Sequence, residues 1–150
     1  MVNSSKNLLP TERSYIYSKF LNLLMYDGKK NVARKIVDES LTKAALKLGN
    51  PTKDILQTAI LNVSPDIEVK SRRMGSSVYQ VPVPLDQSRK INLGIRFLIT
   101  ASRSRRENTM VDKLSLELVD AFNNKGVAIK KKDDLHKLGE QNKSFAHFNW

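Results

Sequence analysis

Apolar side chains recur every three or four residues along most of the chain, which is the spacing of one buried face of an α-helix. Six stretches carry this pattern, and they are predicted to begin near Ser14, Asn31, Thr52, Ser88, Thr109 and about Lys131. At four of these starts stands an Asn, Thr or Ser that is expected to cap the helix with a side-chain oxygen. The predicted ends are marked by Asp27-Gly28, Gly49-Asn50-Pro51, Pro65, Gly126 and Asn142.

One segment breaks the helical pattern. Valines at 69, 78, 81 and 83 flank the sequence Met74-Gly75-Ser76-Ser77, which predicts a β-hairpin from about Ile67 to Val83. With 150 residues, one domain is expected, so the fold class is mostly α, with about six helices and one protruding hairpin. Its predicted core includes Ile36, Leu41, Ile60, Leu98 and Leu118.

The two ends of the chain have no helical periodicity. Residues 1–13 are predicted to form a flexible arm, and residues 143–150 a C-terminal tail. The tail is aromatic from Phe145 to Trp150, and we expect it to dock back on the domain.

The charge balance indicates that this helical domain binds a partner. The net charge is +11, from 26 Lys and Arg against 15 Asp and Glu, and such an excess favours an anionic partner. Nucleic acid is favoured over an anionic membrane surface as this partner. No apolar run approaches the roughly 20 residues that span a bilayer.

The residues that carry catalysis are scarce. Cysteine is absent, and the two histidines, His136 and His147, have no partner at metal-ligand spacing. No phosphate loop, nucleophile elbow or dinucleotide fingerprint is present. We therefore predict no enzymatic activity, no metal, no cofactor and no small-molecule substrate.

The cations are clustered. Residues 66–106 hold nine Lys and Arg against three acids. Arg89, Arg96 and Arg103 recur every seven residues and so share one face of the fourth helix, which Arg105 and Arg106 extend into the next loop. A solvated helix face would carry acids at i±4, yet none lies between Asp86 and Glu107. A phosphate-binding face is therefore favoured over a merely solvated one.

Smaller clusters accompany this face. The hairpin carries Lys70, Arg72 and Arg73 just before its turn, where they favour a finger that contacts nucleic acid over a solvated hairpin. Lys29, Lys30 and Arg34 lie at the turn between the first two helices. The triplet 130–132 is predicted to precede the sixth helix, with Asp133 and Asp134 at its start, and it fits binding and plain solubility equally well.

Four ordered stretches resemble a known family. They are LNLLMYDGKKNVARKIV, PDIEVKSRRMGSSVYQVPV, RKINLGIRFLITASRSRRENTM and ELVDAFNNKGVAIKKKDDLHKLGEQNKSFAHFNW. From about Phe20 to Trp150 the chain is similar to ribosomal protein S7 of the small subunit, in its bacterial-type form. The resemblance implies a structural protein that binds the 3′ major domain of small-subunit rRNA and starts assembly of the head. It also implies a place beside the exit-site tRNA and the mRNA path, in contact with ribosomal protein S11 and other head proteins.

The resemblance also implies which residues bind. Arg106 comes from the charge pattern alone, and the other rRNA-binding positions are Lys29, Lys30, Arg34, Lys70, Arg72, Arg73, Arg89, Lys90, Arg96, Arg103, Arg105, Lys131 and Lys132. The hairpin tip, Arg73, Met74, Gly75 and Ser76, would lie nearest the tRNA and mRNA.

Some positions depart from the family. Residues 1–6 replace a usually Arg-rich arm, Ser76 stands where a second glycine is common, and Asn149 stands where Arg or Lys is common. The weakened arm and the Asn, Lys, Ile and Ser usage favour an organellar ribosome, mitochondrial before plastid, with the bacterial cytoplasm as the alternative.

A free-standing nucleic-acid-binding module is the second hypothesis. A helix-turn-helix would use the short turn at Gly49-Asn50-Pro51, but the helix after it carries only Lys53 and Gln57 as base-reading side chains.

Overall fold

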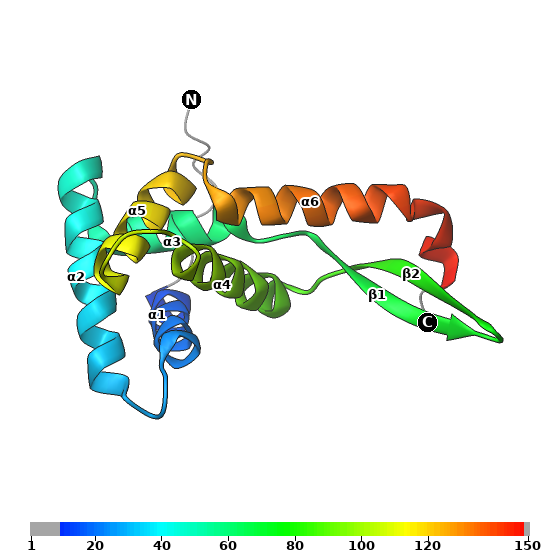
Figure 1. Cartoon of the computed structure of the whole chain (residues 1–150), viewed down its shortest axis with the longest axis horizontal. Helices are drawn as coiled ribbons and strands as arrows, with labels where there is room; N and C mark the ends of the chain where they lie inside the picture. The colour runs from blue at the N-terminus through cyan, green and yellow to red at the C-terminus, as the bar shows by residue number, and fades with distance from the viewer. Residues whose placement is uncertain (1–9, 149–150) are drawn as a thin grey trace.

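The fold consists of a helical body from which a slender arm extends (Figure 1). The structure is a computed structural model that describes residues 10–148, with side chains described from residue 14. Its elements, in chain order, are α1 (Pro10–Leu24), α2 (Lys30–Leu48), α3 (Thr52–Val63), β1 (Ile67–Met74), β2 (Ser77–Pro84), α4 (Gln87–Arg103), α5 (Met110–Phe122), α6 (Val127–Gln141) and the 3-10 helix η1 (Lys143–Phe148). Over these residues the only sheet is the β1–β2 pair, which confirms the predicted mostly α class.

The helix starts differ in part from those predicted. Thr109 does cap α5, because its hydroxyl accepts a hydrogen bond from the Asp112 amide at 3.2 Å. At α4 the cap is Asp86 and not Ser88, since the Asp86 carboxylate accepts from the Arg89 amide at 3.3 Å. The predicted caps Asn31 and Thr52 are wrong: α2 and α3 start one residue beyond Lys29 and Pro51, which make no side-chain cap. α1 begins at Pro10 and so includes the last residues of the predicted N-terminal arm, 1–13. Residues 1–9 of that arm lie outside the described residues.

α6 starts earlier than its sequence pattern indicated. It begins at Val127, directly after Gly126, whose φ of 94° favours glycine. Ala128 and Ile129 are buried in the first turn and anchor it to the body. Residues 130–132 therefore lie within α6, and Asp133 and Asp134 lie beyond the helix start that they were expected to occupy.

The body packs α1 to α5 around one apolar core. Four of the five predicted core residues, Leu41, Ile60, Leu98 and Leu118, are buried. Ile36 is only partly buried at the edge of the core, so its predicted burial is wrong. α3 and α4 approach each other closely at Gly94, where a Cβ atom would lie 3.1 Å from the Ile60 carbonyl oxygen and 3.2 Å from the Ser64 Cα.

The arm is the hairpin together with α6 and η1. β1 and β2 pair in register from Ile67 with Pro84 to Met74 with Ser77, leaving a two-residue loop. Gly75 opens that loop with a φ of 62°, and Ser76 has no positive φ, which is the pattern of a type II′ turn. A second glycine is therefore not needed at Ser76.

α6 supports the base of the hairpin along one side (Figure 1). Gly139 is buried, and a Cβ there would collide with the Ile67 side chain and lie 3.8 Å from the Pro82 Cβ. His136 Nε2 accepts a hydrogen bond from the Asp66 amide at 3.0 Å, just before β1. The close contact at Gly139 and this bond fix the hairpin to α6.

The described part of the tail docks on the hairpin, as expected. In η1 the rings of Phe145 and Phe148 lie 5.1 and 5.4 Å from the Tyr79 ring of β2, centroid to centroid. Val81, next but one along β2, is fully buried. Asn149 and Trp150 lie outside the described residues.

Candidate nucleic-acid interface

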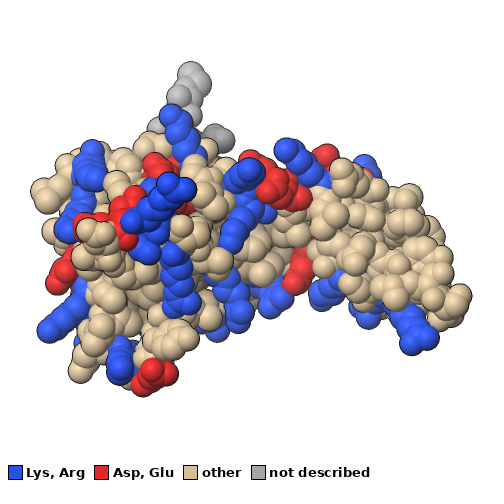
Figure 2. Space-filling model, in the orientation of Figure 1, with Lys and Arg blue, Asp and Glu red and all other residues tan. Residues whose placement is uncertain are grey.

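Basic side chains follow α4 and continue along the hairpin. Figure 2 shows Lys and Arg lining the lower edge of the molecule, beneath the body and out along the arm. Asp86 positions the start of α4 by capping it, and the seven-residue spacing then sets Arg89, Arg96 and Arg103 on one face about 10 Å apart. Arg96 is exposed, and it makes no ion pair or hydrogen bond to the described residues through its guanidinium.

The start of α4 is tied to the base of the hairpin by two ion pairs. Arg89 donates to both Glu68 carboxylate oxygens, at 2.6 and 3.3 Å, and Lys90 donates to Asp66 at 2.7 Å. The Arg89 hydrogen bond lowers the pKa of the Glu68 carboxyl, and the Lys90 hydrogen bond lowers that of Asp66. Half of the Arg89 side chain, 46%, stays exposed, so it can still meet a phosphate from the outside.

Arg103 turns away from the row toward the loop between α1 and α2. Its Nη2 donates to the Leu24 carbonyl oxygen at 3.2 Å. The guanidinium lies 5.9 Å from the centroid of the Tyr26 ring. Arg103 therefore links the end of α4 to the end of α1.

Arg105 is enclosed by carboxylates. Its Nε donates to Glu117 at 2.7 Å, its Nη2 donates to Asp120, and its Nη1 lies 3.6 Å from Glu107. Glu117 is fully buried, and its other oxygen accepts from the Ala128 amide at 3.0 Å. Burial of Arg105 opposes its charge, but the bonds to Glu117 and Asp120 outweigh this and raise the pKa of the guanidinium. Arg105 thus joins α4, α5 and α6, whereas its neighbour Arg106 is exposed.

The hairpin presents its cations unequally. Lys70 and Arg73 are exposed, while Arg72 is half-buried opposite Tyr79. Arg73 Nε donates to the Gly75 carbonyl at 3.3 Å, which keeps its charge at the turn. The predicted tip, residues 73–76, is therefore the end of the arm, with Gly75 and Ser76 exposed.

The two smaller clusters also differ. Lys29, Lys30 and Arg34 are all exposed, at the loop before α2 and in its first turns. In α6, Lys131 is half-buried, and Lys132 donates to the Asn62 carbonyl at 2.7 Å near the end of α3. Lys132 therefore also satisfies a helix terminus within the molecule.

The sequence pattern missed the acids that partner these cations. Counting charges along α4 finds no acid, because the partners come from β1 and α5. Glu117 carried one signal: a single carboxylate within an otherwise apolar helical stripe indicates a buried charge with a partner. Tyr26 was missed because one aromatic residue in a short turn has no distinguishing pattern.

The structure also bears on the other hypotheses. Gln57 is buried, with 7% of its surface exposed, so it cannot read bases in the groove of a DNA duplex.

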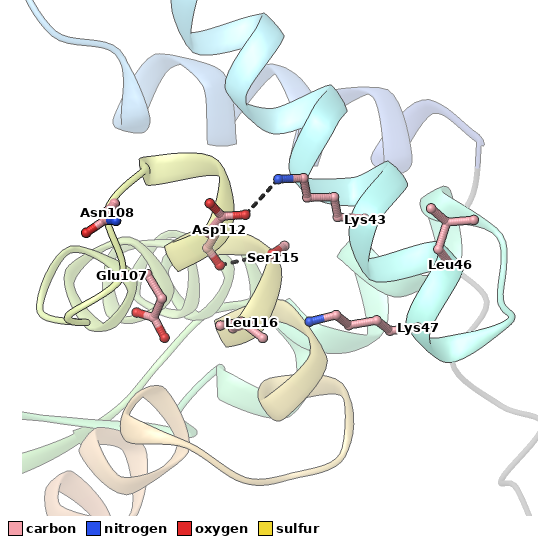
Figure 3. Close-up of a pocket in the computed structure, with 8 residues that line it drawn as sticks. All are labelled: Lys43, Leu46, Lys47, Glu107, Asn108, Asp112, Ser115 and Leu116. Carbon is pink, nitrogen blue, oxygen red and sulfur yellow. Dashed lines mark hydrogen bonds and ion pairs between the residues drawn. The ribbon is translucent and has the colours of Figure 1, made fainter.

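A groove on the protein surface lies between α2 and α5. Lys43 bridges it by an ion pair to Asp112 at 2.7 Å (Figure 3). The groove is lined by Lys43, Leu46, Lys47, Glu107, Asn108, Asp112, Ser115 and Leu116. It contains no histidine or cysteine. Within residues 10–148 no metal-binding cluster and no helix able to cross a membrane is found.

Comparison with known proteins gives a consistent result. The family model described as ribosomal protein S7p/S5e matches residues 2–143. The small ribosomal subunit protein uS7 of Nitratidesulfovibrio vulgaris (strain DP4) is 49% identical over 141 residues, which cover 94% of this chain and 90% of that protein. The uS7 proteins of Psychromonas ingrahamii and Rhodopseudomonas palustris (strain BisB5) are each 46% identical, over 99% and 97% of this chain and 97% and 94% of their own lengths.

Proposed function

The chain belongs to the ribosomal protein S7p/S5e family, and we propose that it binds the 3′ major domain of small-subunit rRNA and nucleates assembly of the head. Membership makes it a structural constituent of the small ribosomal subunit and not an enzyme. The rRNA domain and the assembly role go further and form our proposal.

One observation carries this proposal: exposed cations continue from the body to the tip of the arm. Arg96 on α4, with Lys70 and Arg73 on the hairpin, offers charge that no described carboxylate neutralises by a direct bond. A-form RNA hides its base edges in a deep major groove, so a protein binds it mainly through phosphates, sugars and shape. A body with a projecting basic arm suits a junction of RNA helices.

The proposed contacts differ in how much of each cation is open to solvent. Exposed cations are proposed to bind rRNA directly: Lys29, Lys30, Arg34, Lys70, Arg73, Arg96 and Arg106. The half-buried Arg72 and Lys131 are proposed to bind with the surface that they keep exposed. Those with partners inside the molecule are proposed to add to the field and meet RNA only with their remaining surface: Arg89, Lys90, Arg103 and Lys132. To Arg105 we assign a structural role, because three carboxylates surround it.

The hairpin tip is proposed to lie beside the exit-site tRNA and the mRNA path. Arg73 to Ser76 form the far end of the arm, and the hairpin is supported by α6 and η1 within the chain itself. The tip can therefore reach a mobile ligand without losing its fold. Ribosomal protein S11 and other head proteins are the proposed protein neighbours.

The relatives change the expected compartment. The uS7 proteins named above are bacterial, and they give no support to the predicted mitochondrial or plastid ribosome. We propose the alternative, a ribosome of the bacterial cytoplasm. The weakened N-terminal arm and the residue usage, which suggested an organelle, do not decide the compartment.

The test is binding to a transcript of the 3′ major domain, with a transcript of another small-subunit rRNA domain as control. Replacing both Arg73 and Arg96 with Ala should cost about 1–3 kcal/mol for each charge-assisted bond removed. It should also make the negative slope of log K against log salt shallower, by about 0.9 for each phosphate that is no longer neutralised. The matched control replaces Lys43 and Lys47, on the groove between α2 and α5, and should change neither quantity by as much. Equal effects of the two double variants would overturn the proposal.

A further inference from the structure

An unusually exposed aromatic side chain stands beside the basic surface. Among the described Phe and Tyr residues, Tyr26 is the most exposed, at 71%, and the next, Tyr15, is at 44%. Tyr26 lies in the loop between α1 and α2, just before Lys29 and Lys30, which are exposed as well. Most of its ring therefore faces solvent within a basic loop.

The ring is held by Arg103. The Arg103 guanidinium lies 5.9 Å from the ring centroid, which is within the range of a cation–π contact. Its Nη2 donates to the Leu24 carbonyl at 3.2 Å, so the guanidinium is fixed to the end of α1. Arg103 thus supports Tyr26, and the exposed part of the ring stays available.

The loop backbone is also fixed. Asp27 and Gly28 both have positive φ, 49° and 70°, and so make a tight reversal. The Lys29 amide donates to the Tyr26 carbonyl at 2.9 Å, and the Lys30 amide donates to the Gly28 carbonyl at 2.8 Å. The ring is therefore placed before any ligand arrives, which lowers the entropy cost of binding.

The local charge selects an anionic ligand. Lys29, Lys30 and Arg103 stand against the single acid Asp27, which leaves two positive charges around the ring. An exposed ring with cations beside it is the arrangement by which proteins bind single-stranded nucleic acid: the base stacks on the ring, and the phosphates meet the cations.

We propose that Tyr26 is a stacking platform for one unpaired base of single-stranded RNA, with Lys29 and Lys30 at the adjacent phosphates. This inference rests on the proposed rRNA binding and adds to it a contact with a base. The arginines along α4 offer contacts only to the sugar-phosphate backbone of the RNA. The bound base would come from a loop, a bulge or a strand end, because a paired base has no free face.

The first test compares variants of the full chain for binding to the 3′ major domain transcript. Tyr26→Ala should weaken binding about 5- to 150-fold, the range for one stacked base, and should leave the salt slope unchanged because the ring is uncharged. Tyr26→Phe should bind as wild type does, since stacking needs no hydroxyl. Lys29→Ala with Lys30→Ala should instead lower the salt slope, by about 0.7 for each charge on a single strand.

The second test observes stacking without rRNA. Tyr26→Trp is made together with Trp150→Phe, which removes the one natural tryptophan of the chain. Single-stranded oligoadenylate should quench the fluorescence of the new tryptophan, and duplex RNA of equal charge should quench it much less.

These outcomes separate the two proposals. If wild type binds the transcript but Tyr26→Ala binds equally well, or Tyr26→Phe loses as much as Tyr26→Ala, or no quenching occurs, the platform is overturned and rRNA binding stands. If wild type fails to bind the transcript while oligoadenylate still quenches, the proposed function fails and the platform stands.

Discussion

At the scale of single residues, the same side-chain type serves different purposes along one helix and the loop after it. Arg96 is exposed, Arg89 is half-exposed and paired with Glu68, and Arg105 is enclosed by carboxylates. Their spacing in the sequence placed Arg89, Arg96 and Arg103 on one face, but it could not separate these roles. The separation depends on acids that are distant in sequence, such as Glu117 on α5.

Arg105 and Arg106 form a matched pair for testing this separation. Arg105→Ala should destabilise the fold by about 3–5 kcal/mol, because it leaves the fully buried Glu117 carboxylate without its cation. Arg106→Ala, at an exposed neighbouring site, should change stability by less than about 0.5 kcal/mol. Urea denaturation measures both. Equal losses for the two variants would show that the carboxylate cluster does not stabilise the fold.

The ion pairs at the hairpin base predict an acid-dependent loss of stability. Asp66 and Glu68 have pKa values below their ordinary 3.8 and 4.5, because Lys90 and Arg89 bond to them. The unfolded chain therefore takes up these protons at higher pH than the folded one, and the stabilisation, complete above the ordinary values, is lost as pH falls through the lowered ones.

Thermal melts of wild type and of Asp66→Asn with Glu68→Gln should check this. At pH 7 wild type should be more stable by about 0.2–1 kcal/mol for each of these partly exposed pairs. The gap should narrow steadily below pH 4.5, the ordinary value for Glu68. A gap that stays constant down to pH 3 would contradict the role of these carboxylates.

At the scale of elements, the apolar periodicity predicted the six described α-helices but not every boundary, and it missed the 3-10 helix η1 in the tail. α6 begins at Val127 because Ala128 and Ile129 are buried against the body, a tertiary contact that its weak local pattern does not contain. The hairpin and its turn were predictable, since the valines and the sequence Met74-Gly75-Ser76-Ser77 indicate them. Its packing on α6 was not, because Gly139 looks like a weak point of a helix when it is in fact the site of closest approach.

Gly94 offers a test of such an approach. In an exposed helix Gly→Ala stabilises by about 1 kcal/mol, but here the new Cβ would lie 3.1 Å from the Ile60 carbonyl and 3.2 Å from the Ser64 Cα. Because these are backbone atoms, α3 and α4 must move apart, and we expect Gly94→Ala to destabilise by about 1–3 kcal/mol. The new Cβ would also lie 2.5 Å from the Ser64 hydroxyl oxygen, so removing that hydroxyl in a double variant with Ser64→Ala should restore only part of the loss. A Gly94→Ala variant with raised stability in a urea melt would disprove the close packing.

At the scale of the whole molecule, the body and the arm differ in how much apolar core they contain. The body has a continuous apolar core, and the arm has only a thin one around Val81, Tyr79 and η1. The net charge of +11 predicted an anionic partner for the chain as a whole. Which surface that partner meets depends on how the elements assemble, and the sequence could not supply that.

The tip of the arm should be dispensable for folding. Replacing Arg73 to Val78 with Asn-Gly keeps Arg72 paired with Tyr79 and preserves the contacts to η1. Circular dichroism should show intact helices, and affinity for the 3′ major domain transcript should fall by no more than the about 1–3 kcal/mol expected for the loss of Arg73. Reconstituted subunits should then retain less exit-site tRNA or maintain the reading frame less well. Wild-type retention and accuracy would reduce the tip to an assembly contact.

The docking of η1 on β2 has a consequence for the order in which the chain folds during synthesis. The hairpin ends at Pro84, and the aromatic residues that cover Tyr79 extend to Phe148, 64 residues later (148 − 84). At about 5–20 residues per second, the ribosome needs roughly 3–13 s to add them. An isolated two-stranded hairpin is marginally stable in water, so the hairpin becomes stable only after η1 has been made. Helices α1 to α5 can already pack before then. In the newly made protein, the helices of the body thus fold before the hairpin becomes rigid.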